Sequence, residues 1–417
     1  MVVTSTAPSV FDADLPTFTY GLTATPHDIL DDVREAQARA PIAIGPFGPE
    51  ILSYELAREM LRDNRFRLPP GITLAAQGIT SGPLFDKITT SLLGLDGEPH
   101  TRLRKLVSKA FTPRATARLH DTIHEVVNGL IDRVQDAGHC DVVTAIARPY
   151  PTPIICALIG APSDDWQLFA DWTEQVFTAF NFQPGADFDE AEIMQAWGEL
   201  DAYVDGMVAD RRGTLTEDLL SELIRAESDG ERLTLDELRM LVAGFLMAGT
   251  DTTRNQLAAS VQVLSEHPDQ WAKLGEHPEL AMQAVEESMR HSPAASIVPR
   301  VATQDAEFGG YTFPAGTFVF VNTFAANRDP AIYGDADRFD IARRDAPAIL
   351  TFGGGAHYCL GANLARRELA EALTVLTRRL ASPRRTGPAP WKPLLGMTGP
   401  TALPIEFTTR TPVAADA

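Results

Sequence analysis

The chain has 417 residues and a formal net charge of −20 at pH 7, and this acidity argues against nucleic acid and anionic membranes as partners. Its three cysteines, Cys140, Cys156 and Cys359, match no zinc spacing and form no disulfide framework, which indicates a reducing compartment. The longest apolar stretches are far shorter than the roughly 20 residues that cross a bilayer, and no basic residue precedes Arg34 as a signal peptide would require, so we expect a soluble, cytoplasmic protein.

Apolar residues recur at three- and four-residue spacing in seven segments. They predict helices, in chain order, over residues 53–66, 100–111, 119–138, 216–228, 234–267, 278–292 and 363–380. Strand-like segments are few and short, at residues 42–45, 302–323 and 402–407, and the middle one reads as a hairpin with "GG" at its turn. We therefore predict a mainly α protein with small β-sheets. No linker, charge block or repeat divides it, so we expect one domain over 1–417, with flexible tails at 1–15 and 409–417.

The segment predicted as a helix over 234–267 contains residues that disfavour a helix interior: Gly249, Asp251, Thr252 and Thr253. One interpretation ends a helix at Gly249 and starts another at an Asp251 cap, although Arg254 occupies the position where a capping box needs Glu or Gln. In the other interpretation the helix continues, and an acid and an alcohol lie at a local distortion of the kind often found at functional sites.

A glycine-rich loop, "FGGGAHYCLG" at residues 352–361, carries Cys359 just before a predicted helix. Backbone N–H groups and the positive helix end favour the thiolate there, which makes Cys359 a candidate ligand or nucleophile. Cys140 and Cys156 are expected to be buried and inert.

Three other interpretations of this loop remain open on its residues alone. Cys359 is a buried small residue in a turn. The loop belongs to a dinucleotide fold, although Tyr358 stands where the fingerprint needs a third small residue. Or Cys359 is the nucleophile of a hydrolase, although His357 points elsewhere and no third group is evident.

Taken together and in this order, the segments resemble the cytochrome P450 family of haem-thiolate monooxygenases. The family signature Phe-x-x-Gly-x-x-x-Cys-x-Gly is matched by Phe352, Gly355, Cys359 and Gly361. The stretch Ala/Gly-Gly-x-Asp/Glu-Thr-Thr is matched by Ala248, Gly249, Asp251, Thr252 and Thr253. Glu287 and Arg290, alone an ordinary ion pair, match Glu-x-x-Arg. The resemblance covers about residues 28–408.

The resemblance implies haem b (iron protoporphyrin IX), buried between a long distal helix and the proximal loop, with Cys359 as the iron ligand. Ala248, Phe352, Gly353 and Gly361 are then expected to contact the haem. The cations expected at its two propionates are His100, Arg104, Arg300 and His357. A structural ion cluster of Glu287, Arg290 and Arg338 is also implied.

The implied reaction inserts one atom of dioxygen into a lipophilic small molecule, by hydroxylation or epoxidation. Asp251 and Thr252 are the implied proton-delivering residues, since a hydroxyl both donates and accepts. The variable region at 71–92 and several apolar side chains are expected to contact substrate: Phe177, Phe180, Leu246, Ala248, Ala295, Val298 and Met397. A steroid, terpenoid, fatty acid or polyketide fits equally. A peroxygenase, a non-catalytic haem binder or sensor, and a nicotinamide dehydrogenase are the alternatives.

Electrons from NAD(P)H must arrive through separate proteins, a ferredoxin with its reductase or a flavodoxin-type donor, and the chain is expected to be a monomer. Residues 101–118 carry six basic side chains and no acid. At about 100° per residue, His100, Arg104, Val107 and Phe111 share one side of a helix, and Arg102, Lys105 and Lys109 the other. We expect Arg102, Lys105, Lys109 and Arg366 to dock an acidic ferredoxin; a merely solvated basic face is the alternative.

Overall fold

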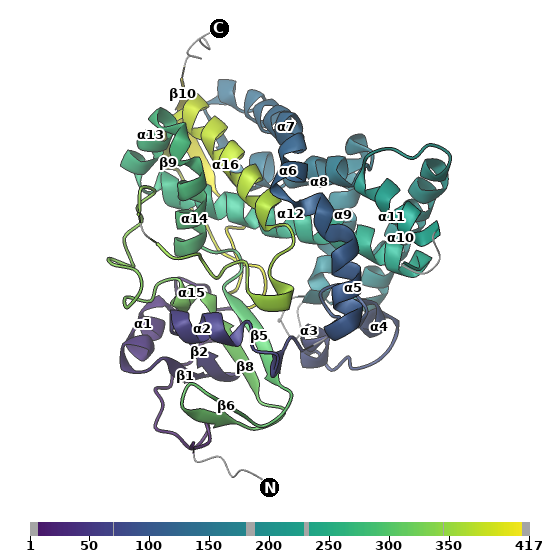
Figure 1. The fold of residues 1–417 in the computed structure, drawn as a ribbon. Coiled ribbons are helices and arrows are strands. Elements are labelled where there is room, and N and C mark those ends of the chain that lie inside the picture. Colours follow the sequence, from purple (N-terminus) through teal and green to yellow (C-terminus); the bar gives the residue numbers. More distant parts are fainter. Residues whose placement is uncertain (1–6, 70, 181–187, 229–232, 345, 411–417) are drawn as a thin grey trace.

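The computed structural model describes residues 7–69, 71–180, 188–228, 233–344 and 346–410. Its longer helices are α1 (Leu30–Arg39), α5 (Gly97–Val107), α7 (His120–Asp132), α8 (Pro151–Ile159), α9 (Trp166–Phe177), α10 (Glu190–Arg212), α11 (Leu219–Ser228), α12 (Leu235–Ser265), α13 (Pro268–Glu276), α14 (Ala281–His291) and α16 (Ala362–Arg379). The shorter helices are α2 (Tyr54–Met60), α3 (Ile72–Ala76), α4 (Pro83–Thr89), α6 (Pro113–Thr116) and α15 (Thr323–Ala326). Figure 1 shows α12 running through the middle of the molecule with most of the longer helices around it, whereas α1, α2 and α15 lie beside the largest sheet.

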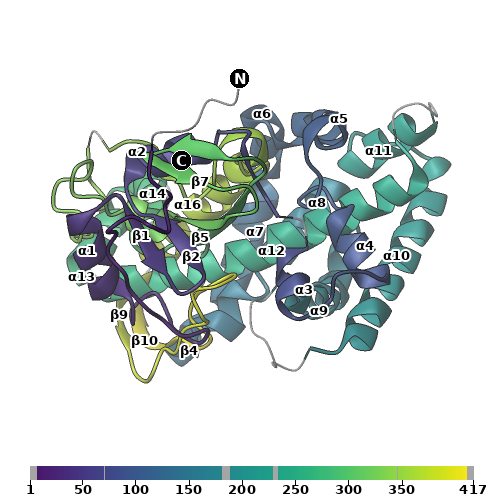
Figure 2. The same ribbon diagram turned by 90° about the horizontal axis from the view of Figure 1, so that it is seen from below.

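The strands form three small sheets. The largest has the order β1-β2-β8-β5-β3, in which only β2 and β8 are parallel, and the others are β4-β10-β9 and the hairpin β6-β7. Their bounds are β1 (Ile42–Gly45), β2 (Gly48–Ile51), β3 (Phe66–Arg67), β4 (His139–Asp141), β5 (Ile297–Ala302), β6 (Ala306–Phe308), β7 (Tyr311–Phe313), β8 (Phe318–Asn322), β9 (Leu380–Arg385) and β10 (Pro404–Thr409). Figure 2, seen from below, places the largest sheet on the same side of the molecule as α1 and α2. The predicted fold class, mainly α with small sheets, is confirmed.

Several predicted boundaries are wrong for identifiable reasons. The segment at 302–323 is not one hairpin: Gly309 and Gly310, with φ of 58° and 87°, turn β6 into β7, and β8 then joins the larger sheet. The ends expected to be flexible are partly fixed, because Val10 is fully buried and donates its N–H to Thr312 O, and Thr409 pairs with Leu380. Only residues 1–6 and 411–417 of those tails lie outside the described residues.

The long helix α12 is continuous over 31 residues and begins at a capping box formed by Thr234 and Glu237. The interpretation with a break at Gly249 is therefore wrong, because the α-helix continues through residues 249–253. Thr252 Oγ1 donates to Ala248 O at 2.8 Å, which lets a threonine occupy a helix interior. A Cβ on Gly249 would lie 2.9 Å from the Ile155 side chain, so this glycine allows α8 to approach α12 closely.

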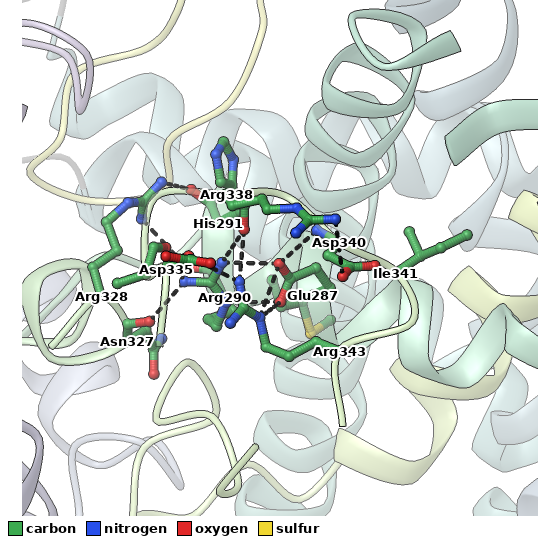
Figure 3. A network of polar contacts seen from close by, with 12 residues as sticks. Glu287, Arg290, His291, Asn327, Arg328, Asp335, Arg338, Asp340, Ile341 and Arg343 are labelled. Atoms are coloured by element: carbon green, nitrogen blue, oxygen red, sulfur yellow. Dashed lines mark hydrogen bonds and ion pairs between the residues drawn. The ribbon is translucent and has the colours of Figure 1, made fainter. Parts of the chain in front are cut away.

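The buried ion cluster differs from the expected one by one arginine (Figure 3). Arg290 binds both carboxylate oxygens of Glu287, at 2.7 and 2.9 Å, and its side chain is 1% exposed. The second arginine on Glu287 is Arg343, whose Nε lies 3.1 Å from Oε2. The Arg338 side chain is 65% exposed and reaches only Asp340, at 3.6 Å, while its carbonyl accepts from Arg290 and Arg343. The predicted role of Arg338 is therefore wrong: its backbone, not its charge, belongs to the cluster.

No helix in the described part of the chain is both long and apolar enough to span a membrane.

Candidate functional site

The loop that carries Cys359 is held in place by glycines and backbone hydrogen bonds. Cys359 N donates to Phe352 O at 2.9 Å, which closes the loop just before α16. Gly355 has a φ of 64°, and a Cβ there would lie 2.5 Å from Leu61 O at the end of α2, so only glycine fits. No strand precedes these glycines, because residues 346–351 are irregular, and the dinucleotide interpretation is wrong.

Burial, rather than the helix end, dominates the acidity of this thiol in the protein alone. Burial raises the pKa of Cys359, and the Gly361 N–H, Arg104 and Arg366 offset it only in part. The expectation that the loop by itself favours the thiolate is therefore wrong. A metal ion bound at this sulfur would favour the thiolate, since a metal deprotonates a coordinating thiol.

The other two cysteines differ in environment from Cys359. Burial raises the pKa of both Cys140 and Cys156 to about 12. The charges that act on their pKa values among the described residues are those of Asp141 on Cys140 and Asp165 on Cys156, whereas Arg104 and Arg366 act on Cys359. Both are poor thiolates, in line with the prediction that they are inert.

Four basic side chains predicted from the sequence gather beside the loop. The rings of His100 and His357 lie 4.3 Å apart, and Arg104 donates to the carbonyl of Tyr358. Arg300 is 3% exposed, and its only hydrogen bond in the described part of the chain goes to its neighbour, Pro299 O.

The four bases share one nearby carboxylate among the described residues, that of Asp96. It lies 4.0 Å from His357 Nε2, a buried nitrogen without a hydrogen-bond partner in the described part of the chain. Burial, with His100 and Arg300 nearby, lowers the pKa of His357 to about 4. The lowered pKa and the orphaned nitrogen both fit a group that brings its own negative charges. Haem fits on these grounds, because its two propionates would find basic partners here and Cys359 could serve as a thiolate ligand for its iron.

One face of α12 stands apart from the rest of the helix. Ala248 is exposed and Thr252 half-buried, whereas Leu246, Met247 and Thr250 are buried. Ala248 and Thr252 are one turn apart and form an accessible stripe. Leu246 is fully buried, about 200° around the helix from Ala248, and packs in the main core. Its predicted contact with substrate is therefore wrong.

Asp251 lies beside this stripe, 5% exposed and engaged by cations. Arg254 Nε donates to Asp251 Oδ1 at 2.7 Å, and Lys392 Nζ lies 3.8 Å from the same oxygen. Arg254 also binds Glu174, which binds Arg148, so a chain of ion pairs links Asp251 to partly exposed groups. None of these partners of Asp251 was predicted from the sequence. Only Arg254 has a spacing that indicates a contact with Asp251, because residues three apart lie on the same side of a helix.

Two groups of predicted substrate contacts are each brought together. Ala295 and Met397 pair across an isolated bridge, and Val298 follows half-buried in β5. The rings of Phe177 and Phe180 lie 5.4 Å apart, and the adjacent Ala179 O accepts a 2.8 Å hydrogen bond from Thr73, which ties them to the region at 71–92. Phe182 lies outside the described residues.

The predicted docking residues divide into two kinds. Lys105, on α5, and Lys109, in the 3-10 turn that follows it (Ser108–Phe111), are both exposed. Arg102 binds Glu237 at the start of α12, and Arg366 binds Glu286 and packs over the Phe352 ring at 4.4 Å. Arg366, with a side chain only 18% exposed, is thus part of the loop's support rather than a free surface cation.

Comparisons with known proteins agree with this geometry. A family model described as Cytochrome P450 matches residues 81–381. Luteothin monooxygenase of Streptomyces thioluteus is 38% identical over 90% of this chain and 92% of its own length. Mycinamicin IV hydroxylase/epoxidase of Micromonospora griseorubida is 36% identical over 87% of this chain and 91% of its own length. The structure of P450epoK with epothilone B bound has a TM-score of 0.85 at 27% identity, and the match covers 93% of this chain and 99% of that one.

Proposed function

Because this chain belongs to the cytochrome P450 family and is a haem-thiolate monooxygenase, we propose that it oxidises a lipophilic small molecule with electrons supplied by separate redox proteins in the cytoplasm. Bound haem supplies the activation of dioxygen, and its thiolate ligand favours O–O cleavage. The observation that carries the proposal is the accessible stripe of Ala248 and Thr252 in the middle of a helix whose residues there are mostly buried. It offers a substrate one small apolar surface and one hydroxyl.

In this proposal the chain's residues have distinct tasks. Cys359 holds the iron, and His100, Arg104, Arg300 and His357 orient the cofactor through its propionates. These basic groups need carboxylate partners in the interior, which makes cofactor binding and local stability interdependent.

Thr252 and Asp251 are proposed to move protons. The Thr252 proton is engaged by Ala248 O, so its oxygen lone pairs are free to accept a hydrogen bond on the accessible side. Asp251 connects outward through Arg254 and Glu174, and its carboxylate must leave Arg254 to carry a proton toward Thr252. Exchange of this ion pair is then a step of proton delivery.

The substrate class follows from the apolar segments and from the relatives. The Phe177–Phe180 pair and the Ala295–Met397 bridge offer rings and small apolar groups but no charge. The relatives act on luteothin and mycinamicin IV, and P450epoK binds epothilone B. Such compounds are the first to screen, by the spectral change of the haem that accompanies substrate binding. NADPH consumption that depends on substrate but yields no product would contradict the proposal. A haem binder without monooxygenase activity would show neither substrate-dependent NADPH consumption nor product.

The proposed electron donor is an acidic ferredoxin or flavodoxin-type protein that docks at Lys105 and Lys109. Both lysines are exposed on a chain whose net charge is −20, so a local basic surface is needed to attract an acidic partner. Reversing both charges to Glu is expected to slow electron transfer and to weaken its dependence on salt, with substrate binding unchanged. The matched control reverses Arg384, which is exposed on β9. Equal transfer rates in both variants would place the docking surface elsewhere.

A further inference from the structure

The side chain at the start of α5, Asp96, is an acid among the bases of the proposed haem site. Its Oδ1 accepts the N–H of the next residue at 2.7 Å, which fixes the carboxylate to the backbone at the first turn of the helix. Burial lowers the pKa values of His100, Arg300 and His357, and the charge of Asp96 opposes the shift in all three. One carboxylate therefore acts on several of the groups expected to meet the haem propionates.

Arg67 binds the other oxygen of this carboxylate. Its Nε lies 3.3 Å from Asp96 Oδ2, whereas Asp96 Oδ1 lies 4.0 Å from His357 Nε2. Arg67 belongs to β3 and pairs with the residue that follows Arg300 in β5. The side chains of Arg67 and Asp96 are 53% and 32% exposed, so the ion pair is in contact with solvent. It links the largest sheet, which carries Arg300, to the start of α5.

The charges around this ion pair can be counted. A guanidinium keeps its proton at every pH of interest, so Arg104 and Arg300 are permanent cations. They equal the two propionates of haem in number. Asp96 adds one negative charge to the cluster, and Arg67 adds one positive charge. Because like charges repel, an acid beside the propionates weakens haem binding unless its own partner offsets it.

We propose that Asp96 competes with the haem propionates for the bases of the site, and that Arg67 limits this competition by holding the Asp96 carboxylate. The inference rests on the proposed propionate site. Arg67 is a positioning residue, because it acts through Asp96 and needs no contact with the haem. Together the two side chains set how long the protein retains its cofactor, without taking part in the reaction.

The test measures haem transfer from the ferric holoenzyme to excess apomyoglobin, whose absorbance reports haem loss without any substrate or electron donor. Asp96→Asn removes the charge while its amide oxygen still caps α5, and it is expected to slow haem loss about threefold. Arg67→Met frees the carboxylate and is expected to speed haem loss about threefold. Both effects should shrink as sodium chloride is added, because salt screens exposed charges.

A double variant shows whether Arg67 acts through Asp96. If it does, the protein with both Asp96→Asn and Arg67→Met loses haem as slowly as the one with Asp96→Asn alone. A return to the wild-type rate would mean that the two charges act on haem separately, which would overturn the positioning role of Arg67. The matched controls are Glu406→Gln and Arg384→Met, which break an exposed 2.9 Å ion pair between β9 and β10 and should leave haem loss unchanged.

Variants of Arg300 separate this inference from the proposed propionate site. Arg300→Met is expected to speed haem loss at least tenfold, and Arg300→Lys, which keeps the charge, by a smaller factor. Unchanged haem loss in both would refute the propionate site itself. If the Arg300 variants lose haem faster but Asp96→Asn does not slow the loss, the propionate site stands and the competition by Asp96 is refuted.

Discussion

Replacing Arg343 by Met is expected to destabilise the protein, whereas the same replacement of Arg338 is not. Arg343 has a side chain 13% exposed, and its Nε lies 3.1 and 3.3 Å from the two carboxylate oxygens of Glu287. Its Nη atoms donate to Gly334 O at 2.6 Å, to Asp335 O at 3.1 Å and to Arg338 O at 2.7 Å. The loop that these bonds hold includes Asp335, which has a φ of 48°.

The magnitude follows from what remains after the substitution. Removing one partner of a buried ion pair costs about 3–5 kcal/mol when the other charge is left alone. Glu287 keeps Arg290 and the Asp340 N–H, and Asp335 O keeps the Arg338 N–H, so we expect a smaller loss, about 2–3 kcal/mol. The Arg338 side chain pairs only weakly, and its replacement should change the free energy of unfolding by no more than about 0.5 kcal/mol.

The assay is urea unfolding of the two holoenzyme variants, followed at once by far-UV circular dichroism and by haem absorbance. Coincidence of the two signals checks that unfolding and haem loss occur together. Equal midpoints for the two variants, or a larger loss with Arg338→Met, would refute the assignment of Arg343 to the cluster.

Three further predictions concern the haem site and the sheet. Cys359→Ala is expected to abolish the red-shifted ferrous carbonyl band of thiolate ligation, which Cys156→Ala should keep; the band's survival in the first variant would exclude Cys359 as ligand. Thr252→Ala should retain haem but lower the rate of product formation roughly 10²- to 10⁴-fold and divert NADPH into peroxide, and unchanged coupling measured by product and peroxide yields would contradict its role. Burial raises the pKa of Glu50 from 4.5 to about 7, although hydrogen bonds from Tyr20 and Asn322 act in the opposite direction. The contribution of Glu50 to the free energy of unfolding is therefore complete below about pH 4.5 and is lost as the pH rises through about 7. Relative to Glu50→Gln, the wild type should lose about 3 kcal/mol of unfolding free energy over that range, and parallel pH profiles of the two proteins would show that Glu50 ionises normally.

The proximal site was predictable from the sequence because its residues lie in short, ordered motifs. The spacing within residues 352–361 fixes a loop and a following helix, and His100 and Arg104 are one helical turn apart. In the structure His100 lies beside His357 and Arg104 donates to Tyr358 O, so both bases lie next to the loop.

Other parts of the site depend on contacts that no local spacing encodes. Lys392 reaches Asp251 from 141 positions away in the chain, and Glu174 reaches Arg254 from 80. Arg338 and Arg343 lie five residues apart on one irregular segment, so only the path of the backbone decides which of them turns inward.

Two of the helices that were not predicted lack the pattern on which the prediction depends. Helix α8, "PTPIICALI", is apolar on nearly every side because it is buried between other helices, so it has no helical period to detect. Helix α10 extends over 23 residues although it contains two internal glycines, Gly198 and Gly206, which disfavour a helix. In both cases tertiary packing overrides local preference.

The contact between Gly249 and Ile155 constrains how this enzyme can acquire new substrates. Any side chain at Gly249 would force either the Ile155 side chain or α12 itself to shift, next to the stripe that carries Ala248 and Thr252. If this stripe has the proposed role in proton delivery, that wall of the active site is costly to remodel. Under the same proposal, selection or directed evolution for a larger or differently shaped substrate would act on the region at 71–92 and on the Phe177–Phe180 pair, where short helices and glycine turns tolerate change.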